Sequence, residues 1–354
     1  VDIGGGSTEF CFVNKGKVEK SISLNIGTVR IKELYFNKND VDGAKKYILD
    51  NLKKILDLEI TIPKKVVGIG GSIRALSKIV MAKNQYPLDI LHGYVYQVKD
   101  EISLFDRISR AKNNEDLKSF GVKKDRFDTI KEGAFIFKTI LDELKIDEVV
   151  TSGVGVREGA YLTDLLRNSN HKFPENFNIS VRSLLDRFQI DEKQSAYLGN
   201  NAKKIFDVLK PIHNLDNKFR SLLVISSKLH SIGSTLNFYK SNDNAFDFIL
   251  NGLNYDFLHT SRVVVAHTIK FSKKSLPSRN DILKYEDLLP SLEVMQWMSF
   301  MISLNIAINQ DLSRPKVEYV LNDDTLQITL LNKSFLIESN IEKLESPEDL
   351  NIKI

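Results

Sequence analysis

The sequence predicts an α/β domain, then an all-α domain, and a small α+β segment at the carboxyl end. Strand-like and helix-like segments alternate over residues 1 to about 170, and apolar residues recur at helical spacing beyond residue 198. Three of the short strands also end in glycine-rich turns. With 354 residues, 42% of them hydrophobic, the chain can bury the cores of two or three domains. We expect these domains at residues 1–168, 178–285 and 286–354.

The expected elements of the first domain follow the chain in order. Residues 10–13 and 18–24 have strand-like patterns and are joined by a hairpin turn at 14–16. Residues 42–56 and 128–144 each carry apolar side chains on one helical face. Buried strands at 66–69 and 149–151 lead into glycines and then into helices, to about residues 79 and 166. This alternation predicts helices packed on a sheet.

The pattern changes after a polar stretch at residues 168–176, which contains Pro174 and is typical of a linker. Beyond it, apolar spacing predicts a series of helices: 198–209, 219–229, 245–250, 260–271 and 288–308. Residues 317–338 alternate like a hairpin, with turn signals at 322–324 and 332–333.

Composition limits the classes of partner. Lys and Arg exceed Asp and Glu by 50 to 46, and a net charge of +4 suits an anionic ligand without indicating nucleic acid. The single cysteine, Cys11, excludes an internal disulfide and a multi-cysteine metal site, so we expect a reducing cytoplasm. The longest apolar run, residues 292–308, is too short and too polar for a membrane span. We therefore expect a buried helix there and no membrane partner.

The three glycine turns are the candidate ligand-binding features: Gly4-Gly5-Gly6-Ser7, Gly70-Gly71-Ser72 and Ser152-Gly153-Val154-Gly155. Glycine lets the backbone approach a ligand, so successive amide N–H groups can bind phosphate oxygens beside a helix N-terminus. Ser7, Thr8 and Ser72 can add hydroxyl donors, and Asp2 is placed to hold Mg²⁺ directly or through water.

Simpler explanations stay open for each feature taken alone. A pair of glycines after a strand is usually only a tight turn, and Glu9 is equally well explained as an exposed strand carboxylate. The turns match neither a Walker loop, which needs Gly-Lys-Ser/Thr, nor the Gly-x-Gly-x-x-Gly dinucleotide pattern.

Four stretches, in order, resemble the exopolyphosphatase/guanosine-pentaphosphate phosphatase (Ppx/GppA) family. Residues 2–9 (DIGGGSTE) resemble its signature, and residues 23–30 (SLNIGTVR) resemble its Ser-Leu-x-x-Gly-x-Val-Arg. Residues 67–72 (VGIGGS) resemble its second glycine turn, and residues 152–159 (SGVGVREG) its Ser-x-x-Gly-x-Arg-Glu-Gly. Arg126 falls where the family has an arginine before its long helix. The resemblance covers residues 1 to about 165 and continues more faintly over 180–275.

This resemblance implies an actin-like (ribonuclease H-like) fold and Mg²⁺-dependent hydrolysis of a terminal phosphoanhydride. The implied substrates are inorganic polyphosphate and guanosine pentaphosphate or tetraphosphate, and the implied assembly is a homodimer. Asp2 would hold the metal and take part in catalysis, and Glu9 would be a supporting catalytic carboxylate. The residues implied to bind phosphate are Gly4, Gly5, Gly6, Ser7, Thr8, Gly70, Gly71, Ser72 and Arg126.

The family's principal catalytic glutamate lies in a first lobe, before the position that Val1 occupies here. The chain also opens inside a strand that runs directly into the first glycine turn. We therefore expect a C-terminal fragment of the enzyme, which binds phosphate weakly and has no turnover alone.

In longer family members the helical part is related to metal-dependent HD phosphohydrolases, whose site needs histidines and an aspartate around a divalent metal. The likeness places its His-Asp pair at His230 and Ser231, and its other histidine positions at Ser195 and Ser272. We expect a degenerate HD-like fold without HD chemistry. It would serve dimerisation or line a channel for a long anionic substrate.

Two other functions explain the glycine turns. One is a noncatalytic binding or sensing protein for phosphorylated nucleotides, and the other is a kinase relative of the same actin-like fold. The kinase explains residues 152–159 and the helical part less well. Polyphosphate and guanosine pentaphosphate remain open alternatives, because both present the same terminal anhydride.

Overall fold

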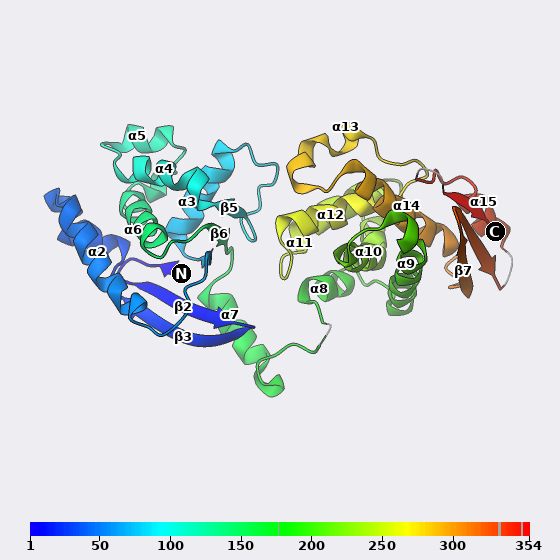
Figure 1. Ribbon diagram of the computed structural model, residues 1–354, viewed down its shortest axis with the longest axis horizontal. Helices are drawn as coiled ribbons and strands as arrows, with labels where there is room; N and C mark the ends of the chain where they lie inside the picture. The colour runs from blue at the N-terminus through cyan, green and yellow to red at the C-terminus, as the bar shows by residue number, and fades with distance from the viewer. Residues whose placement is uncertain (176, 332–333, 348–349) are drawn as a thin grey trace. The chain divides into compact units, whose positions relative to one another are not determined.

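The computed structural model describes residues 1–175, 177–331, 334–347 and 350–354, and the chain divides into two compact units. The first unit comprises residues 1–173 and the second residues 174–354 (Figure 1). A finer division of the second unit at residue 286 stays a prediction.

The first unit is α/β, as the alternating pattern predicts. Its strands are β1 (Asp2–Ile3), β2 (Thr8–Asn14), β3 (Lys17–Leu24), β4 (Lys65–Gly68), β5 (Val95–Gln97) and β6 (Glu148–Thr151). Its helices are α1 (Thr28–Leu34), α2 (Val41–Leu56), α3 (Gly71–Lys83), α4 (Val98–Ser109), α5 (Asn114–Ser119), α6 (Ile130–Glu143) and α7 (Val156–Leu165). Three 3₁₀ turns complete it: η1 (Phe36–Lys38), η2 (Lys124–Arg126) and η3 (Arg167–Ser169).

Two three-stranded sheets of this unit meet at β1. The antiparallel sheet has the order β1-β2-β3, and the second sheet has the order β4-β6-β5, with β4 and β6 parallel. A parallel bridge between Asp2 and Ile69 joins them, and the Val1 carbonyl accepts from the Ile69 N–H at 2.8 Å. The strands therefore run in the combined order β3-β2-β1-β4-β6-β5.

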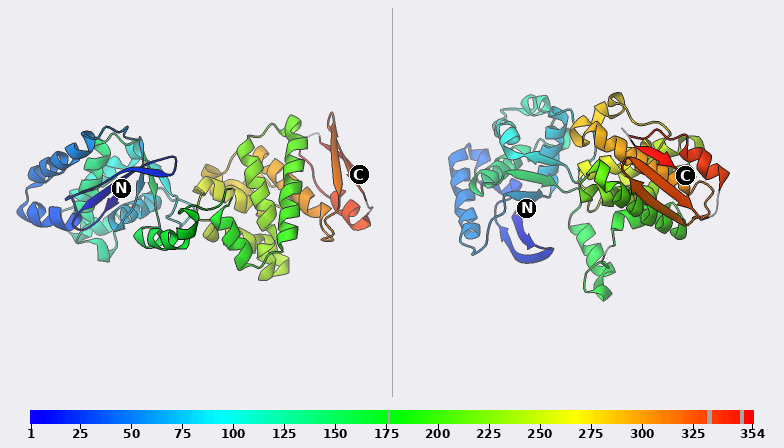
Figure 2. Two further views of the ribbon diagram at one scale, coloured as in Figure 1. Left: turned by 90° about the horizontal axis from the view of Figure 1, so that it is seen from below. Right: turned by 45° about the vertical axis from the view of Figure 1, so that its right-hand side comes forward.

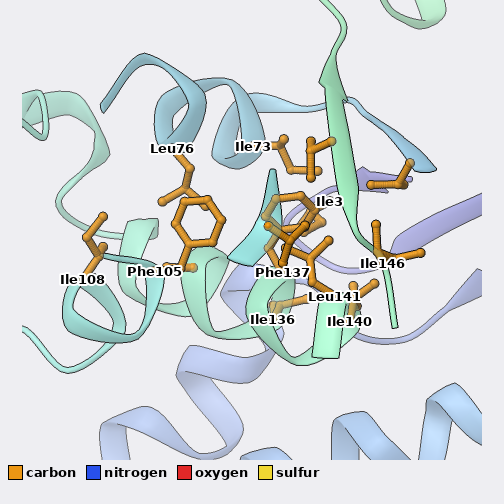
Figure 3. Packing of buried hydrophobic residues seen from close by; sticks show 14 of the residues in the cluster. Ile3, Ile73, Leu76, Phe105, Ile108, Ile136, Phe137, Ile140, Leu141 and Ile146 are labelled. Atoms are coloured by element: carbon orange, nitrogen blue, oxygen red, sulfur yellow. The ribbon is translucent and has the colours of Figure 1, made fainter. Parts of the chain in front are cut away.

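The core of the first unit lies between this sheet and its helices. Helices α1, α2, α3 and α4 all pack against α6, which makes α6 the centre of the helical layer. Ile3, Ile73 and Phe137 are all buried, and Figure 3 shows them converging with other side chains of α3, α4 and α6. Burial of this apolar surface anchors β1 and the start of α3, the two elements that carry glycine turns.

The second unit is mainly helical, as predicted. Its helices are α8 (Ile179–Arg187), α9 (Glu192–His213), α10 (Asn217–Leu229), α11 (Ser241–Gly252), α12 (His259–Lys270), α13 (Arg279–Ile282), α14 (Leu292–Ile308) and α15 (Phe335–Ile341). Its 3₁₀ turns are η4 (His230–Thr235), η5 (Phe238–Lys240) and η6 (Leu283–Leu288), and its strands are β7 (Val317–Asn322), β8 (Thr325–Leu330) and β9 (Asn351–Lys353).

A buried polar network ties the small sheet to the helices. The Asn201 amide donates to Asn305 Oδ1 at 2.9 Å, and the Tyr319 hydroxyl donates to Asn201 Oδ1 at 2.9 Å. These contacts join α9, α14 and β7, and Figure 2 shows the sheet at the edge of the helical layer from two directions. Satisfied buried amides of this kind fix one register between the elements.

The prediction of a hairpin near the end of the chain is correct only in part. Strands β7 and β8 pair around a turn at 323–324, as predicted. The expected continuation to residue 338 is wrong, because α15 begins at Phe335 and buries Ile337 and Ile341 at helical spacing. The turn predicted at 332–333 lies outside the described residues.

The predicted buried helix at the longest apolar run is confirmed, since α14 buries most of its side chains. No single helix within the described residues has the length and apolar character needed to cross a bilayer. One pair, Arg279–Leu288 with Leu292–Ile308, meets those limits together but is bent by 110°.

Candidate phosphate-binding site

The three glycine turns lie at one edge of the sheet. β1 is parallel to β4, and β4 is parallel to β6, so their carboxyl ends share an edge. Each of these strands runs into one of the turns at that edge (Figure 1). Segments far apart in the sequence are thereby brought together, which is where open α/β sheets usually bind ligands.

In the first turn the carbonyls of Gly4 and Gly5 accept from α1, while the Gly4 N–H donates to the Ser7 carbonyl at 2.9 Å and is not free for a ligand. Thr28 N–H donates to the Gly4 carbonyl at 3.0 Å, and Val29 N–H donates to the Gly5 carbonyl at 2.9 Å. Among the described residues, the N–H groups of Gly5 and Gly6 have no hydrogen-bond acceptor. Two exposed amides without an internal partner are suited to an anion.

Gly27 and Arg30 hold this turn, and neither was among the candidate site residues. A Cβ on Gly27 would lie 2.3 Å from the Gly5 carbonyl oxygen, so only glycine allows α1 to start here. Arg30 Nε donates to the Gly6 carbonyl at 2.9 Å. Both residues belong to the stretch 23–30, and that motif was the signal for them.

The two hydroxyls of the first turn point in different directions. Thr8 is fully buried, and its hydroxyl donates to the Ile26 carbonyl at 2.5 Å. Thr8 therefore supports the turn from inside, and its hydroxyl is engaged away from any ligand. The Ser7 hydroxyl donates to Glu9 Oε1 at 2.5 Å, and the Ser23 hydroxyl donates to the same oxygen at 2.9 Å.

The carboxylates of Asp2 and Glu9 belong to cross-strand partners in the antiparallel pair β1–β2. Partners directly opposite each other project from the same face. Burial, and then the negative charge of Glu9, raise the pKa of Asp2 above its ordinary value, while the Val1 ammonium and Arg74 oppose the change. Two neighbouring carboxylates, one partly desolvated, form a setting that a divalent cation would neutralise.

The second turn presents a helix N-terminus. Gly70 has φ of +93°, and a Cβ there would lie 2.5 Å from Asp2 Oδ1, so the turn requires glycine. No side chain caps α3, whose first residues are Gly71 and Ser72. The buried Ser72 lies against Gly133 of α6, where an added Cβ would come within 2.8 Å of the serine hydroxyl. The uncapped amides and the helix dipole both favour an anion at Gly70–Gly71.

Arg126 is brought to the second turn by η2. One terminal guanidinium nitrogen lies 2.6 Å from the point that a Cβ on Gly71 would occupy. The only described ion pair of Arg126 is a long contact with Asp125, 3.5 Å from Nε, and 44% of its side chain is exposed. The guanidinium is therefore free to pair with a phosphate group.

A pocket of about 500 Å³ opens beside Gly71 and α3. Four cationic side chains line it, with a single carboxylate from Asp125; the cations are Arg74, Lys78, Lys123 and Arg126. Such an excess of positive charge raises the local concentration of anionic ligands.

The third turn is braced internally. Arg74 Nε donates to the Ser152 carbonyl at 2.8 Å, and its terminal nitrogen donates to the Val154 carbonyl at 2.9 Å. Glu158 accepts from the Gly155 N–H at 2.7 Å, and this hydrogen bond lowers the pKa of Glu158. Arg74, which the sequence analysis did not single out, thus connects the second turn to the third.

The positions that we predicted to correspond to an HD site lie near one another in the second unit. Ser195, His230 and Ser231 line one cavity, and Ser272 accepts from Asn242, another residue of that cavity, at 3.1 Å. Within the described residues, no group of three or more His, Cys, Asp or Glu side chains could hold a metal ion. The HD-like assignment itself stays a prediction.

Comparison with known proteins identifies the first unit. Residues 1–168 match the Ppx/GppA phosphatase family. A guanosine-5'-triphosphate,3'-diphosphate pyrophosphatase of Vibrio campbellii is 26% identical over 257 residues, which are 69% of this chain and 49% of that protein. The protein of the same name from Photobacterium profundum is 24% identical over 288 residues, covering 78% of this chain and 55% of that protein.

Two solved structures are also similar. A Ppx/GppA family member of Aquifex aeolicus is 30% identical, with a TM-score of 0.41, over 47% of this chain and 55% of that chain. An exopolyphosphatase of Cytophaga hutchinsonii is 21% identical, with a TM-score of 0.42, over 46% of this chain and 55% of that chain.

The chain spans about half the length of the curated relatives it matches. The family match covers the segment that contains all three glycine turns, and it agrees with the predicted actin-like α/β fold of that segment. Over residues 1–168, this chain matches the Ppx/GppA phosphatase family.

Proposed function

We propose that this chain forms one wall of an active site that hydrolyses terminal phosphoanhydrides and releases inorganic phosphate. The observation that carries the proposal is the uncapped start of α3, with Arg126 over Gly71 and the free amides of Gly5 and Gly6 at the same sheet edge. Convergent amides and a guanidinium recognise phosphate oxygens without a base or sugar.

The residues of this chain bind and orient the substrate. The amides of Gly5, Gly6 and Gly71 would hold oxygens of the terminal phosphoryl group and its neighbour, and Arg126 would stabilise their charge. Positioning and electrostatic stabilisation dominate phosphoryl transfer, because the transition state makes few covalent demands on the protein. Water adds to the terminal phosphorus, the bond to the bridging oxygen breaks, and the shortened polyphosphate or nucleotide leaves.

Asp2 and Glu9 fit a magnesium site. Mg²⁺ typically takes one or two carboxylates together with substrate phosphates, and these two carboxylates belong to cross-strand partners beside the glycine turns. The bound ion would neutralise charge on the transferred group. Because Asp2 must be ionised to hold it, Mg²⁺-dependent phosphate binding should weaken as pH falls through the raised pKa of Asp2.

Guanosine pentaphosphate is the first substrate to test, since two relatives are named as enzymes acting on guanosine-5'-triphosphate,3'-diphosphate. Inorganic polyphosphate presents the same terminal anhydride and is the second. A homodimer and a cytoplasmic location are parts of the same proposal, which the family resemblance supports.

Binding by the chain can be tested with Arg126→Met. Titration calorimetry with pyrophosphate and Mg²⁺ should show affinity at least about tenfold lower, the usual cost of losing a charged hydrogen bond. Arg110→Met is the matched control, because Arg110 is an exposed arginine of the same unit that pairs with Asp106. Equal affinities for the two variants would exclude Arg126 from the site.

Turnover needs the longer protein that contains this chain. We expect it to release phosphate from guanosine pentaphosphate, from polyphosphate or from both in the presence of Mg²⁺. Release from neither substrate, by a preparation that still binds pyrophosphate, would leave a binding protein rather than a hydrolase.

A further inference from the structure

The second unit contains a cavity of about 660 Å³ that the proposed activity does not use. It is formed by α9, the end of α10, η4, the start of α11 and α14. Its size is in the range of small-molecule sites. Ser195, His230 and Ser231, the positions predicted to correspond to a degenerate HD centre, lie on its wall.

Lys228 gives the cavity an uncompensated positive charge. Its side chain extends from α10 across α9, where a Cβ on Gly199 would lie 2.7 Å from Lys228 Cε. It has no hydrogen bond or ion pair with any described residue. The one carboxylate on the wall, Asp191, caps α9 by accepting from the Gln194 N–H at 2.7 Å. A half-buried ammonium without an anionic partner is a position for a ligand anion.

Polar groups around Lys228 supply further contacts. His230 Nδ1 lies 3.0 Å from the Ser227 carbonyl, which can only accept, so Nδ1 carries the proton. Burial lowers the pKa of His230, so the ring is neutral at physiological pH and Nε2 is an acceptor. The hydroxyls of Ser195 and Ser231 donate to no other described residue. One ring-nitrogen acceptor and two serine hydroxyls can together hydrogen-bond the hydroxyl groups of a sugar.

Two aromatic rings border the same cavity. Phe188 lines the cavity and stacks on Phe248, with ring centroids 4.6 Å apart at 29°. Phe238, in η5, also lines the cavity and is 76% exposed. An exposed ring at the border of a polar cavity offers a face on which a flat heterocycle can stack.

We propose that this cavity is a noncatalytic site for a nucleoside monophosphate, with its phosphate on Lys228, its sugar among the serines and its base against the phenylalanines. The site is separate from the glycine turns and does not depend on the activity proposed for them. A family member with two sites could sense a nucleotide with one unit and bind phosphate with the other.

The test is calorimetric titration of the 354-residue chain with GMP. Lys228→Met should weaken binding at least tenfold. Lys218→Met is the matched control, since this lysine is on the same helix, is exposed and lies over the Phe219 ring outside the cavity. It should leave binding within twofold of the original chain. Equal affinity of the Lys228 and Lys218 variants would overturn the proposal.

Two further titrations separate the parts of the ligand. Inorganic phosphate and guanosine should each bind at least tenfold more weakly than GMP. Phosphate that binds as tightly as GMP would overturn the nucleoside assignment, and guanosine that does so would overturn the role of Lys228. A measurement without a variant follows the reductive methylation of Lys228 by mass spectrometry. GMP should slow it at least fivefold while Lys218 is unaffected, and equal rates with and without GMP would contradict the site.

Discussion

The conformation of the Gly5–Gly6 turn depends on Gly27, a residue of another strand–helix junction. The carbonyls of the turn face the first amides of α1, and this leaves the Gly5 and Gly6 amides free. The close approach is possible because Gly27 has no side chain, since a Cβ would lie 2.3 Å from the Gly5 oxygen. Gly27 therefore determines indirectly which groups a ligand meets.

Gly27→Ala should lower the free energy of unfolding by about 1–3 kcal/mol, the usual cost of overpacking. It should also weaken pyrophosphate binding, because α1 and the turn must move apart. Gly6→Ala is the control for stability, since nothing lies within 4 Å of a Cβ at that position. Urea denaturation of both variants tests this, and similar losses of stability would contradict it.

Glu132 is a second residue whose surroundings predict a measurable effect. Only 4% of it is exposed, and Oε2 has no partner among the described residues. Burial raises the pKa of Glu132, with Lys32 and Lys131 opposing. The folded state therefore resists ionisation of this carboxyl more than the unfolded state does, and stability from this group falls as pH rises through its folded pKa.

Glu132→Gln should raise the free energy of unfolding at pH 8 by about 1 kcal/mol, since it removes a buried carboxylate whose Oε2 has no hydrogen-bond partner among the described residues. The gain should vanish below about pH 4, where the carboxyl is protonated in both states. Glu143→Gln, at an exposed position of the same helix, serves as the control. Thermal unfolding at the two pH values measures both, and a gain that is the same at each pH would exclude the ionisation of Glu132 as its cause.

The sequence predicted the individual residues of the site unevenly. The signature stretch and the second glycine turn supplied Asp2, Glu9, Gly70 and Gly71, and the structure places these at one sheet edge. The expected contact between the Thr8 hydroxyl and a ligand was wrong, because strand alternation places the Thr8 side chain on the buried face of β2. Thr8 and Phe10 are buried while Glu9 is exposed, so period-two alternation was available as a signal. Arg74 could not be found, since its contacts bridge two turns distant in sequence.

At the scale of elements, the contact between α3 and α6 sets the position of the second turn. Gly133 lets the helices approach until Ser72 would lie 2.8 Å from an added Cβ. Helix propensity alone favours alanine over glycine by about 1 kcal/mol. Packing and propensity therefore oppose each other at this position.

Gly133→Ala should destabilise the first unit by about 1–3 kcal/mol, because overpacking outweighs propensity. Gly159→Ala supplies the comparison, since this exposed glycine lies inside α7 and a Cβ there meets nothing within 4 Å. It should stabilise by about 0.5–1 kcal/mol. Urea denaturation distinguishes them, and stabilisation by both substitutions would show that the helices separate freely.

Several elements with a clear apolar pattern were predicted, and α1 and β5 are among those that were not. Helices α2, α6 and α9 follow apolar stripes, whereas α1 has seven residues and no side-chain cap at Gly27. β5 has three residues and exists by pairing antiparallel with β6. The wrong extension of the terminal hairpin has a similar origin, because the burial of Ile337 and Ile341 selects helix over the local alternation.

At the scale of the whole chain, the two units contain buried ionisable groups that change the free energy of unfolding in opposite directions as the pH is lowered. In the second unit, burial lowers the pKa of His213, His230 and His267, the last to about 4. Between pH 6.5 and 4, His267 is protonated in the unfolded state and neutral in the folded state. The free energy of unfolding therefore decreases as the pH is lowered, by on the order of 3 kcal/mol for this residue. In the first unit, Asp2 and Glu132 have raised pKa values, and their effect has the opposite sign.

Acidification from pH 7 to pH 5 should therefore destabilise residues 174–354 before residues 1–173. Hydrogen exchange of the intact chain, read by mass spectrometry, should show faster exchange in α12 and α14 at pH 5, after correction for the intrinsic rate, and little change in α6. His267→Gln should reduce this dependence on pH, although it lowers stability at pH 7 by removing the contacts with Phe246, Phe271 and Tyr285. His171→Gln is the control, because His171 is exposed and lies before the second unit. A uniform response of both units to acid would show that the buried histidines do not govern it.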